Sequence, residues 1–180
     1  MIRGGLIYFY VLLTCVIIFA SFNLEGLDIM GDGYKLEDIG GNPNSPYSLQ
    51  VYTSVEKYSK KYKIPKHIAY NIAYLETRYQ GPFDWDYHGK LTSYAGAKGP
   101  MQIMPKTANY IGGRNITQKE LLNNIDLNVE LSMKLLHKLR KQYDRWDLIC
   151  GYYNTGYPQV NEYAKFCVGN LDYKKNWVKY

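Results

Sequence analysis

Apolar residues recur at helical spacing in the middle of the chain. Between residues 65 and 79 they repeat every three or four positions, which is the period of one helix face. The repeating residues are Ile68, Ile72, Leu75 and Tyr79. Pro65 suits the start of such a helix, because its missing N–H group would have no partner there. The pattern predicts an amphipathic helix whose apolar face ends at Glu76.

Two further helices are predicted in the next part of the chain. Pro105 and the pair Gly112-Gly113 bracket a short helix. Thr117 and Glu120 have the spacing of a capping box, which indicates the start of another helix.

A long helix and a final short one complete the predicted fold. The long helix reaches about residue 143 and carries a row of leucines on one face: Leu127, Leu131, Leu135 and Leu139. The last helix is expected to run from Asp147, as its N-cap, to Gly156. No segment alternates apolar and polar residues for long enough to indicate a sheet. The predicted fold class is therefore mainly α.

The N-terminus has a different character. Residues 6–22 are an uncharged apolar run of 17 residues that follows a single arginine, Arg3. Such a run is near the minimum for a helix that crosses a bilayer and slightly long for the core of a signal peptide. Residues 1–22 are therefore predicted to be a signal anchor or a signal peptide. The poor cleavage pattern near Ala20 favours an uncleaved apolar helix that holds the chain at a membrane.

Residues 23–50 are predicted to be an acidic, flexible tether. They contain five acidic residues and one lysine, and their glycines and prolines interrupt any period. The arginine before the apolar run predicts a cytoplasmic N-terminus. The rest of the chain is then exported. It would face the periplasm or cell wall if anchored, or be secreted if the segment is cleaved.

Residues 51–180 are predicted to form one folded domain, and this domain is strongly basic. It holds 20 Lys and Arg against 11 Asp and Glu, a net charge of +9. A basic domain outside the membrane could meet nucleic acid, anionic lipid or an anionic cell-wall polymer. No nucleic-acid partner is expected, because the location disfavours it and no binding module is visible. The three histidines lie far apart without a metal-binding motif, so no metal and no cofactor are predicted.

Four segments, taken in order, resemble one family. They are LETRY around Glu76, SYAGAKGPMQIMPKTA from Ser93, NVELSMKLL from Asn128 and GYYNTGYPQV from Gly151. Together they resemble the soluble-type lytic transglycosylase (SLT) domain of the lysozyme-like superfamily, over roughly residues 51 to 165. The resemblance implies a single domain with the fold shared by goose-type lysozymes and SLT domains. It also implies that the partner is the glycan strand of peptidoglycan.

Glu76 corresponds to the catalytic glutamate of that family. Breaking a glycosidic bond needs a carboxylic acid that is neutral near pH 7, and burial at an apolar helix end raises a carboxyl pKa. In the family, the C6 hydroxyl of N-acetylmuramic acid replaces water, so one glutamate can donate the first proton and accept the second. The product is a 1,6-anhydro sugar. Thr77 stands where members commonly have serine, keeps the hydroxyl and is expected at the substrate site.

The resemblance also implies a substrate-binding loop and turn. The loop from Ser93 would line the cleft, and Ser93 itself is expected at the substrate-binding site. Gln102 would present its amide to an N-acetyl group and Met101 would present apolar surface. Core packing explains Met104 better. The other substrate-binding residues implied by the resemblance are Tyr153 and Asn154.

Two other functions stay open. Asp84 and Asp86 follow Glu76 in a long segment, GPFDWDYHGK, and goose-type lysozymes use acidic residues in such a region to hold a hydrolytic water. Local backbone bonding in a turn also explains both aspartates. Alternatively, the domain only binds peptidoglycan as part of a phage particle or an envelope-spanning machine, although the retained Glu76 argues for an enzyme.

Cys150 and Cys167 are the only cysteines outside the apolar run. In an oxidising compartment, two short helices joined near Gly156 could bring them together as a disulfide. The alternative is that both are small buried apolar residues, because a domain of this size does not need a covalent link.

Overall fold

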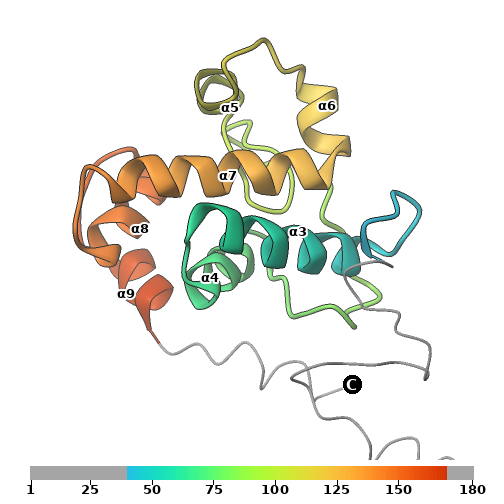
Figure 1. Cartoon of the computed structure of the whole chain (residues 1–180), viewed down its shortest axis with the longest axis horizontal. Helices are drawn as coiled ribbons and strands as arrows, with labels where there is room; N and C mark the ends of the chain where they lie inside the picture. Colours follow the sequence, from blue (N-terminus) through green and yellow to red (C-terminus); the bar gives the residue numbers. More distant parts are fainter. Residues whose placement is uncertain (1–39, 170–180) are drawn as a thin grey trace, which may run out of the picture. The chain divides into compact units, whose positions relative to one another are not determined.

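The structure is a computed structural model of the chain, in which residues 40–169 are described (Figure 1). The mainly α fold class is confirmed. The helices labelled in Figure 1 are α3 (Tyr47–Tyr62), α4 (Lys66–Thr77), α5 (Pro105–Gly112), α6 (Gln118–Asn123), α7 (Ile125–Arg140), α8 (Trp146–Thr155) and α9 (Glu162–Val168). Within residues 40–169 no helix is both long and apolar enough to cross a membrane. The predicted anchor lies outside the described residues.

The folded domain begins before residue 51. Helix α3 starts at Tyr47, and the side chains of Ser48 and Leu49 are buried. The Ser48 hydroxyl donates a hydrogen bond to the carbonyl of Pro82, 3.0 Å away. The last residues of the predicted tether therefore belong to the domain, because their burial outweighs the turn-forming residues around Pro46.

Helix α7 lies between two hydrophobic cores. Its residues Val129, Met133 and Leu136 are buried in the main core with α3, α4, α8 and α9. Leu131 instead enters a smaller core with residues from around α5 and α6. In Figure 1, α5 and α6 lie on the side of α7 opposite to α3 and α4. The predicted row of leucines is therefore only part of the buried surface. A helix that packs on two sides has no single apolar stripe, so the period alone underestimated its burial.

Helix α4 ends two residues earlier than the apolar pattern predicted. Ile68 and Ile72 are buried as expected. Arg78 adopts a left-handed conformation with φ of 62°, and its N–H group donates to the carbonyl of Tyr74. This C-cap stops the helix at Thr77 and leaves Glu76 in its last turn.

The predicted helix ends are partly confirmed. The Thr117 side chain accepts from the Glu120 N–H group, and Gly156 ends α8 with φ of 79°. The prediction that Asp147 is the N-cap of α8 was wrong. Arg145 occupies that position, and its guanidinium holds the Asp147 carboxylate inside the first helical turn.

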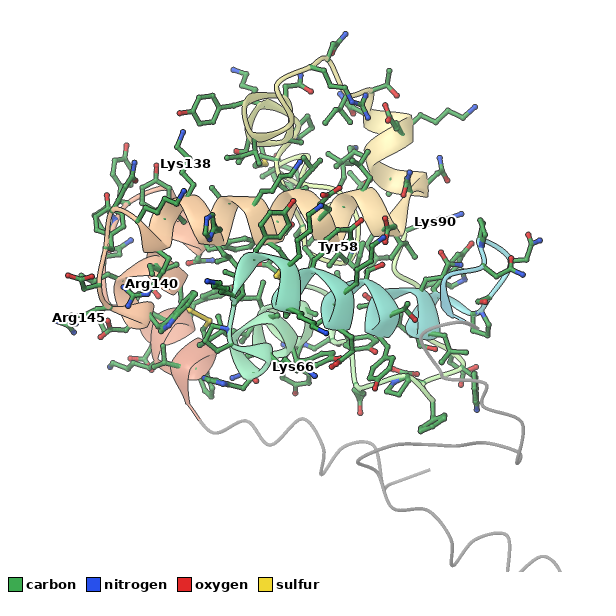
Figure 2. The ribbon with its side chains drawn as sticks, in the orientation of Figure 1. Tyr58, Lys66, Lys90, Lys138, Arg140 and Arg145 are labelled. Atoms are coloured by element: carbon green, nitrogen blue, oxygen red, sulfur yellow. A yellow bond between two sulfur atoms is a disulfide. The ribbon has the colours of Figure 1, made fainter. Side chains whose placement is uncertain are left out.

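A disulfide between Cys150 and Cys167 joins α8 to α9. Of the two predicted alternatives, a disulfide or two separate buried cysteines, the structure has the disulfide. Cys150 and Cys167 are fully buried, and their Cα atoms lie 6.2 Å apart. Figure 2 draws the disulfide as a yellow bond. A second link comes from α4, because the Asn71 amide donates to the carbonyls of Cys167 and Gly169 at 2.8 and 3.0 Å. Helix α9 is therefore held to both α8 and α4.

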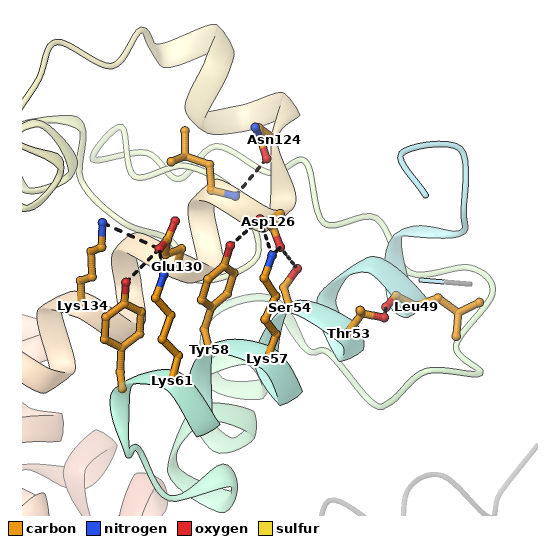
Figure 3. Close-up of polar contacts among 12 residues, drawn as sticks. Leu49, Thr53, Ser54, Lys57, Tyr58, Lys61, Asn124, Asp126, Glu130 and Lys134 are labelled. Atoms are coloured by element: carbon orange, nitrogen blue, oxygen red, sulfur yellow. Dashed lines mark hydrogen bonds and ion pairs between the residues drawn. The ribbon is translucent and has the colours of Figure 1, made fainter. Parts of the chain in front are cut away.

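Helices α3 and α7 run side by side in the same direction, joined by polar contacts (Figure 3). The Tyr58 hydroxyl donates to Asp126 at 2.6 Å, and the Tyr62 hydroxyl donates to Glu130 at 2.8 Å. Lys57 also reaches the Asp126 carboxylate. Exposed ion pairs contribute little stability, whereas tyrosine hydroxyls bonded to carboxylates define the register of the two helices.

Removing the disulfide should destabilise the domain without changing its fold. A loop of this length gives an expected loss of about 3 kcal/mol in the free energy of unfolding for Cys150→Ala/Cys167→Ala. Urea denaturation of the parent and of the variant measures the difference. Thiol labelling of the unreduced, unfolded parent should find only Cys15, so three reactive thiols would contradict the disulfide.

Candidate active site

Glu76 lies half-buried in the last turn of α4. Its Oε1 atom accepts a hydrogen bond of 2.7 Å from the hydroxyl of Tyr163, which belongs to α9. Burial raises the pKa of the Glu76 carboxyl, and the Tyr163 hydrogen bond opposes this rise only in part. The carbonyl end of the helix dipole also disfavours a negative charge there. The site therefore keeps the carboxyl protonated to higher pH than an exposed glutamate.

Two tyrosines accompany Glu76. Burial and the neighbouring Glu76 charge both raise the pKa of Tyr153 and of Tyr163, so both phenols stay protonated and can donate. Tyr153 was predicted from the resemblance, whereas Tyr163 was missed. The sequence held one indication that Tyr163 faces the interior, because it precedes Cys167 by one helical turn. A disulfide to α8 turns that face of α9 inward.

The loop of residues 91–103 is attached to three helices through one buried stretch of backbone, Pro100–Met101. The Pro100 carbonyl accepts from the Thr77 hydroxyl at 3.0 Å. The Met101 N–H group donates to the Asn128 side chain at 3.2 Å, and the Met101 carbonyl accepts from the Tyr153 hydroxyl at 2.7 Å. These bonds come from α4, α7 and α8, and we call them the Met101 clamp.

Asn128 is the fully buried member of the clamp on α7. Besides accepting from Met101, its amide donates to the carbonyls of Lys98 and Leu121. Gly99 makes this approach possible, because a Cβ atom there would lie 2.4 Å from the Asn128 amide nitrogen. The sequence marked Asn128 as the head of a family-like helix but assigned it no role.

Ser93 and Gln102 hold the loop together internally. The Ser93 hydroxyl accepts from the Ala97 N–H group at 3.0 Å. The Gln102 amide donates to the carbonyls of Leu91 and Gly99, and its backbone has a positive φ of 47°. These hydrogen bonds stabilise the turns that shape the wall of the site. Neither side chain bonds to Glu76.

The burial of Met101 and Met104 is the reverse of what the sequence predicted. Met101 was expected to present apolar surface to substrate, but its side chain is 0% exposed and belongs to the main core. Met104 was expected in the core, but it is 40% exposed. The reason is the clamp, which draws the Met101 backbone between the helices and takes its side chain into the interior.

Thr77 is also buried, with its hydroxyl bonded to other parts of the chain. It faces the carbonyl of Ala73 in its own helix, the carbonyl of Pro100 and the hydroxyl of Tyr87, at 3.1, 3.0 and 2.7 Å. Asn154 is exposed at the end of α8, where its side-chain oxygen accepts from Asn161 at 3.1 Å. The structure thus brings Thr77, Tyr153 and the loop backbone to Glu76.

Asp84 and Asp86 do not act on Glu76. Burial, followed by the charge of Asp86, raises the pKa of Asp84, while Asp86 is exposed in the same turn. Neither aspartate contributes to the pKa shift of Glu76, and no hydrogen bond joins either to it within residues 40–169. Around Glu76, the described residues therefore provide one carboxyl with two phenols, and no second carboxylate shifts its pKa.

The comparison with protein families agrees with this geometry. The model of the transglycosylase SLT domain matches residues 53–174, more than half of the chain. The chain belongs to this family. SLT domains are lytic transglycosylases that act on peptidoglycan, and they share the lysozyme-like fold. No curated protein sequence matches the chain.

The residues matched by the family model include every part of the site described above. It begins within α3 and extends past α9, so it covers Glu76, the Met101 clamp and Tyr163. The disulfide between α8 and α9 therefore lies inside the matched region and supports the face that meets Glu76.

The raised pKa predicts that the Glu76 charge reduces stability. The ordinary pKa of a glutamate carboxyl is 4.5, and below this pH the Glu76 carboxyl is mostly neutral in both the folded and the unfolded chain. As the pH rises, the unfolded chain loses this proton before the folded domain does, so the folded state is penalised. Glu76→Gln should therefore be more stable than the parent at neutral pH, and the difference should vanish below about pH 4.5.

Urea denaturation across this pH range measures that difference. The control is Glu162→Gln, which removes an exposed carboxylate paired with Lys165 and should bring no gain. A Glu76→Gln variant that is no more stable than the parent at neutral pH would show that the carboxyl is well solvated.

Proposed function

We propose that this SLT domain cleaves the β-1,4 bond between N-acetylmuramic acid and N-acetylglucosamine without water, leaving 1,6-anhydro ends. The observation that supports this best is the half-buried Glu76 carboxyl. Burial raises its pKa, and no second carboxylate contributes to this shift. A general acid must carry its proton near neutral pH, and this environment favours the protonated form.

In the proposed reaction, Glu76 acts twice. It first donates its proton to the glycosidic oxygen, and the bond from this oxygen to C1 of N-acetylmuramic acid breaks. The C6 hydroxyl of the same sugar then forms a bond to C1 and returns its proton to the Glu76 carboxylate. Tyr163 donates to Oε1 throughout, so it stabilises the carboxylate between the two steps and leaves the other oxygen to carry the proton.

The remaining groups position the glycan. The Met101 clamp holds the loop of residues 91–103 beside Glu76, and the half-exposed Gln102 and the exposed Asn154 are the predicted polar contacts for N-acetyl groups. Met101 cannot contribute its side chain, because it is fully buried. Ser93 and Thr77 would then act by shaping the loop, since their hydroxyls already bond to the protein.

Goose-type hydrolysis is the second candidate. It would need Asp84 or Asp86 to hold a water molecule, and Asp84 is favoured of the two because burial raises its pKa. The site gives less support to this reaction, because neither aspartate shifts the pKa of Glu76.

Replacing Glu76 should abolish most of the activity. Glu76→Gln preserves size and a hydrogen-bond acceptor but removes the transferable proton, so the rate should fall about 10²- to 10⁴-fold. The assay follows soluble fragments released from purified cell-wall sacculi, and mass spectrometry identifies their ends. The products of the parent should be one water lighter than those of a lysozyme.

Matched controls separate the three functions. Asp84→Asn and Asp86→Asn should each retain most activity. Reducing-end products that are lost in either variant would instead identify a hydrolase. A parent that binds sacculi without releasing any fragment would identify a non-catalytic binding component of a larger assembly.

We also propose that the domain works outside the cytoplasmic membrane, attached through residues 6–22. The 17-residue apolar run after Arg3 and the disulfide of the domain support this location. Fractionation of cells that express the full chain should find it with membranes. A mature soluble form that begins near residue 23 would show that the segment is a cleaved signal peptide.

A further inference from the structure

Tyr87 anchors the segment of residues 81–90 in the interior. Its side chain is 8% exposed, and its ring meets the ring of Tyr79 edge-on, with the centroids 5.2 Å apart. Its hydroxyl lies 2.7 Å from the Thr77 hydroxyl oxygen. Because Thr77 follows Glu76 directly, this hydrogen bond connects residues 81–90 to the end of α4 that carries the candidate acid.

The direction of the hydrogen bonds follows from the atoms present. The Thr77 hydroxyl has one proton and faces two carbonyl oxygens, those of Pro100 and Ala73, which can only accept. In the arrangement that satisfies a carbonyl, the Thr77 proton points to that oxygen, and Tyr87 is the donor to the Thr77 oxygen. Burial raises the pKa of Tyr87, so its phenol keeps the proton that it donates.

The two carbonyls compete for the Thr77 proton. A bond to Ala73 lies within the helix and contributes nothing to the loop, whereas a bond to Pro100 is one part of the Met101 clamp. Donation from Tyr87 polarises the Thr77 hydroxyl and orients its free proton, and consecutive hydrogen bonds of this kind strengthen each other. Without Tyr87, the hydroxyl can turn towards Ala73 and release Pro100.

We propose that Tyr87 is a positioning residue that keeps the Thr77 hydroxyl on the Pro100 carbonyl and so holds the loop of residues 91–103 against Glu76. The proposal rests on the function proposed for Glu76. It assigns to residues 81–90 an effect on the reaction rate that does not require them to touch the substrate.

The test compares two buried tyrosines. Tyr87→Phe removes the hydroxyl that bonds to Thr77, and Tyr79→Phe removes one that donates to the Ser48 carbonyl instead, at 3.1 Å. Both variants lose one buried hydrogen bond, so a similar fall in melting temperature is expected. Only Tyr87→Phe should lower kcat/KM on sacculi, by about 10- to 10²-fold, because a small displacement of a positioning element has effects of this size.

Variants of Thr77 test the same connection from its other end. Thr77→Val should lower kcat/KM as Tyr87→Phe does, and Thr77→Ser, which restores the hydroxyl, should recover most of the loss. The double variant Tyr87→Phe/Thr77→Val should be no worse than the poorer single variant, because both interrupt one chain of hydrogen bonds. Independent effects that multiply in the double variant would overturn the proposal, as would equal activity in Tyr87→Phe and Tyr79→Phe.

Hydrogen exchange gives a readout that does not need activity. Amide exchange in residues 91–103 should be about tenfold faster in Tyr87→Phe than in the parent, and unchanged in Tyr79→Phe. An inactive parent would refute the proposed function, while the exchange rates would still decide whether Tyr87 holds the loop. If Tyr87→Phe does not fold at the assay temperature, the Thr77 pair decides, and equal exchange in Thr77→Val and Thr77→Ser overturns the proposal.

Discussion

The site depends on a buried stretch of backbone whose N–H and carbonyl groups need hydrogen-bond partners, because no strand among residues 40–169 lies beside it to provide them. Pro100 and Met101 lie in the interior, and the strand-like pairing of the loop within the described residues is limited to the isolated bridges Thr92–Lys98 and Lys98–Ile103. Buried peptide groups without partners are costly, so side chains from three helices supply the hydrogen bonds. This requirement brings α4, α7 and α8 to one point and places the loop next to Glu76.

A second set of constraints places α9. The disulfide holds it to α8, and the Asn71 amide holds its last carbonyls to α4. A helix of seven residues has little stability of its own, so these links define where Tyr163 lies. The result is a phenol that donates to a carboxyl whose pKa burial raises. The burial that favours the protonated form of Glu76 therefore also penalises its charged form in the folded domain.

The sequence predicted much of the fold and the identity of one central residue. The apolar periods of α4 and α7, the cap at Thr117 and the stop at Gly156 were local features, and the structure has them. The family was visible because its motifs are short and contiguous. The roles of Met101 and Met104 were exchanged, because both lie in the same apolar motif and nothing local tells which one turns inwards.

By itself, the sequence determined the helical class, the family, and Glu76 as the candidate acid at the end of an apolar helix. The apolar period and each of the family motifs consist of residues that are near neighbours in the sequence. Only the tertiary structure decided that Tyr163 meets Glu76, that Asn128 holds Met101 and that Tyr87 reaches Thr77. The partners in the first two pairs are 87 and 27 residues apart. Such contacts depend on which buried polar groups need a partner after the helices pack, and no local spacing records that requirement.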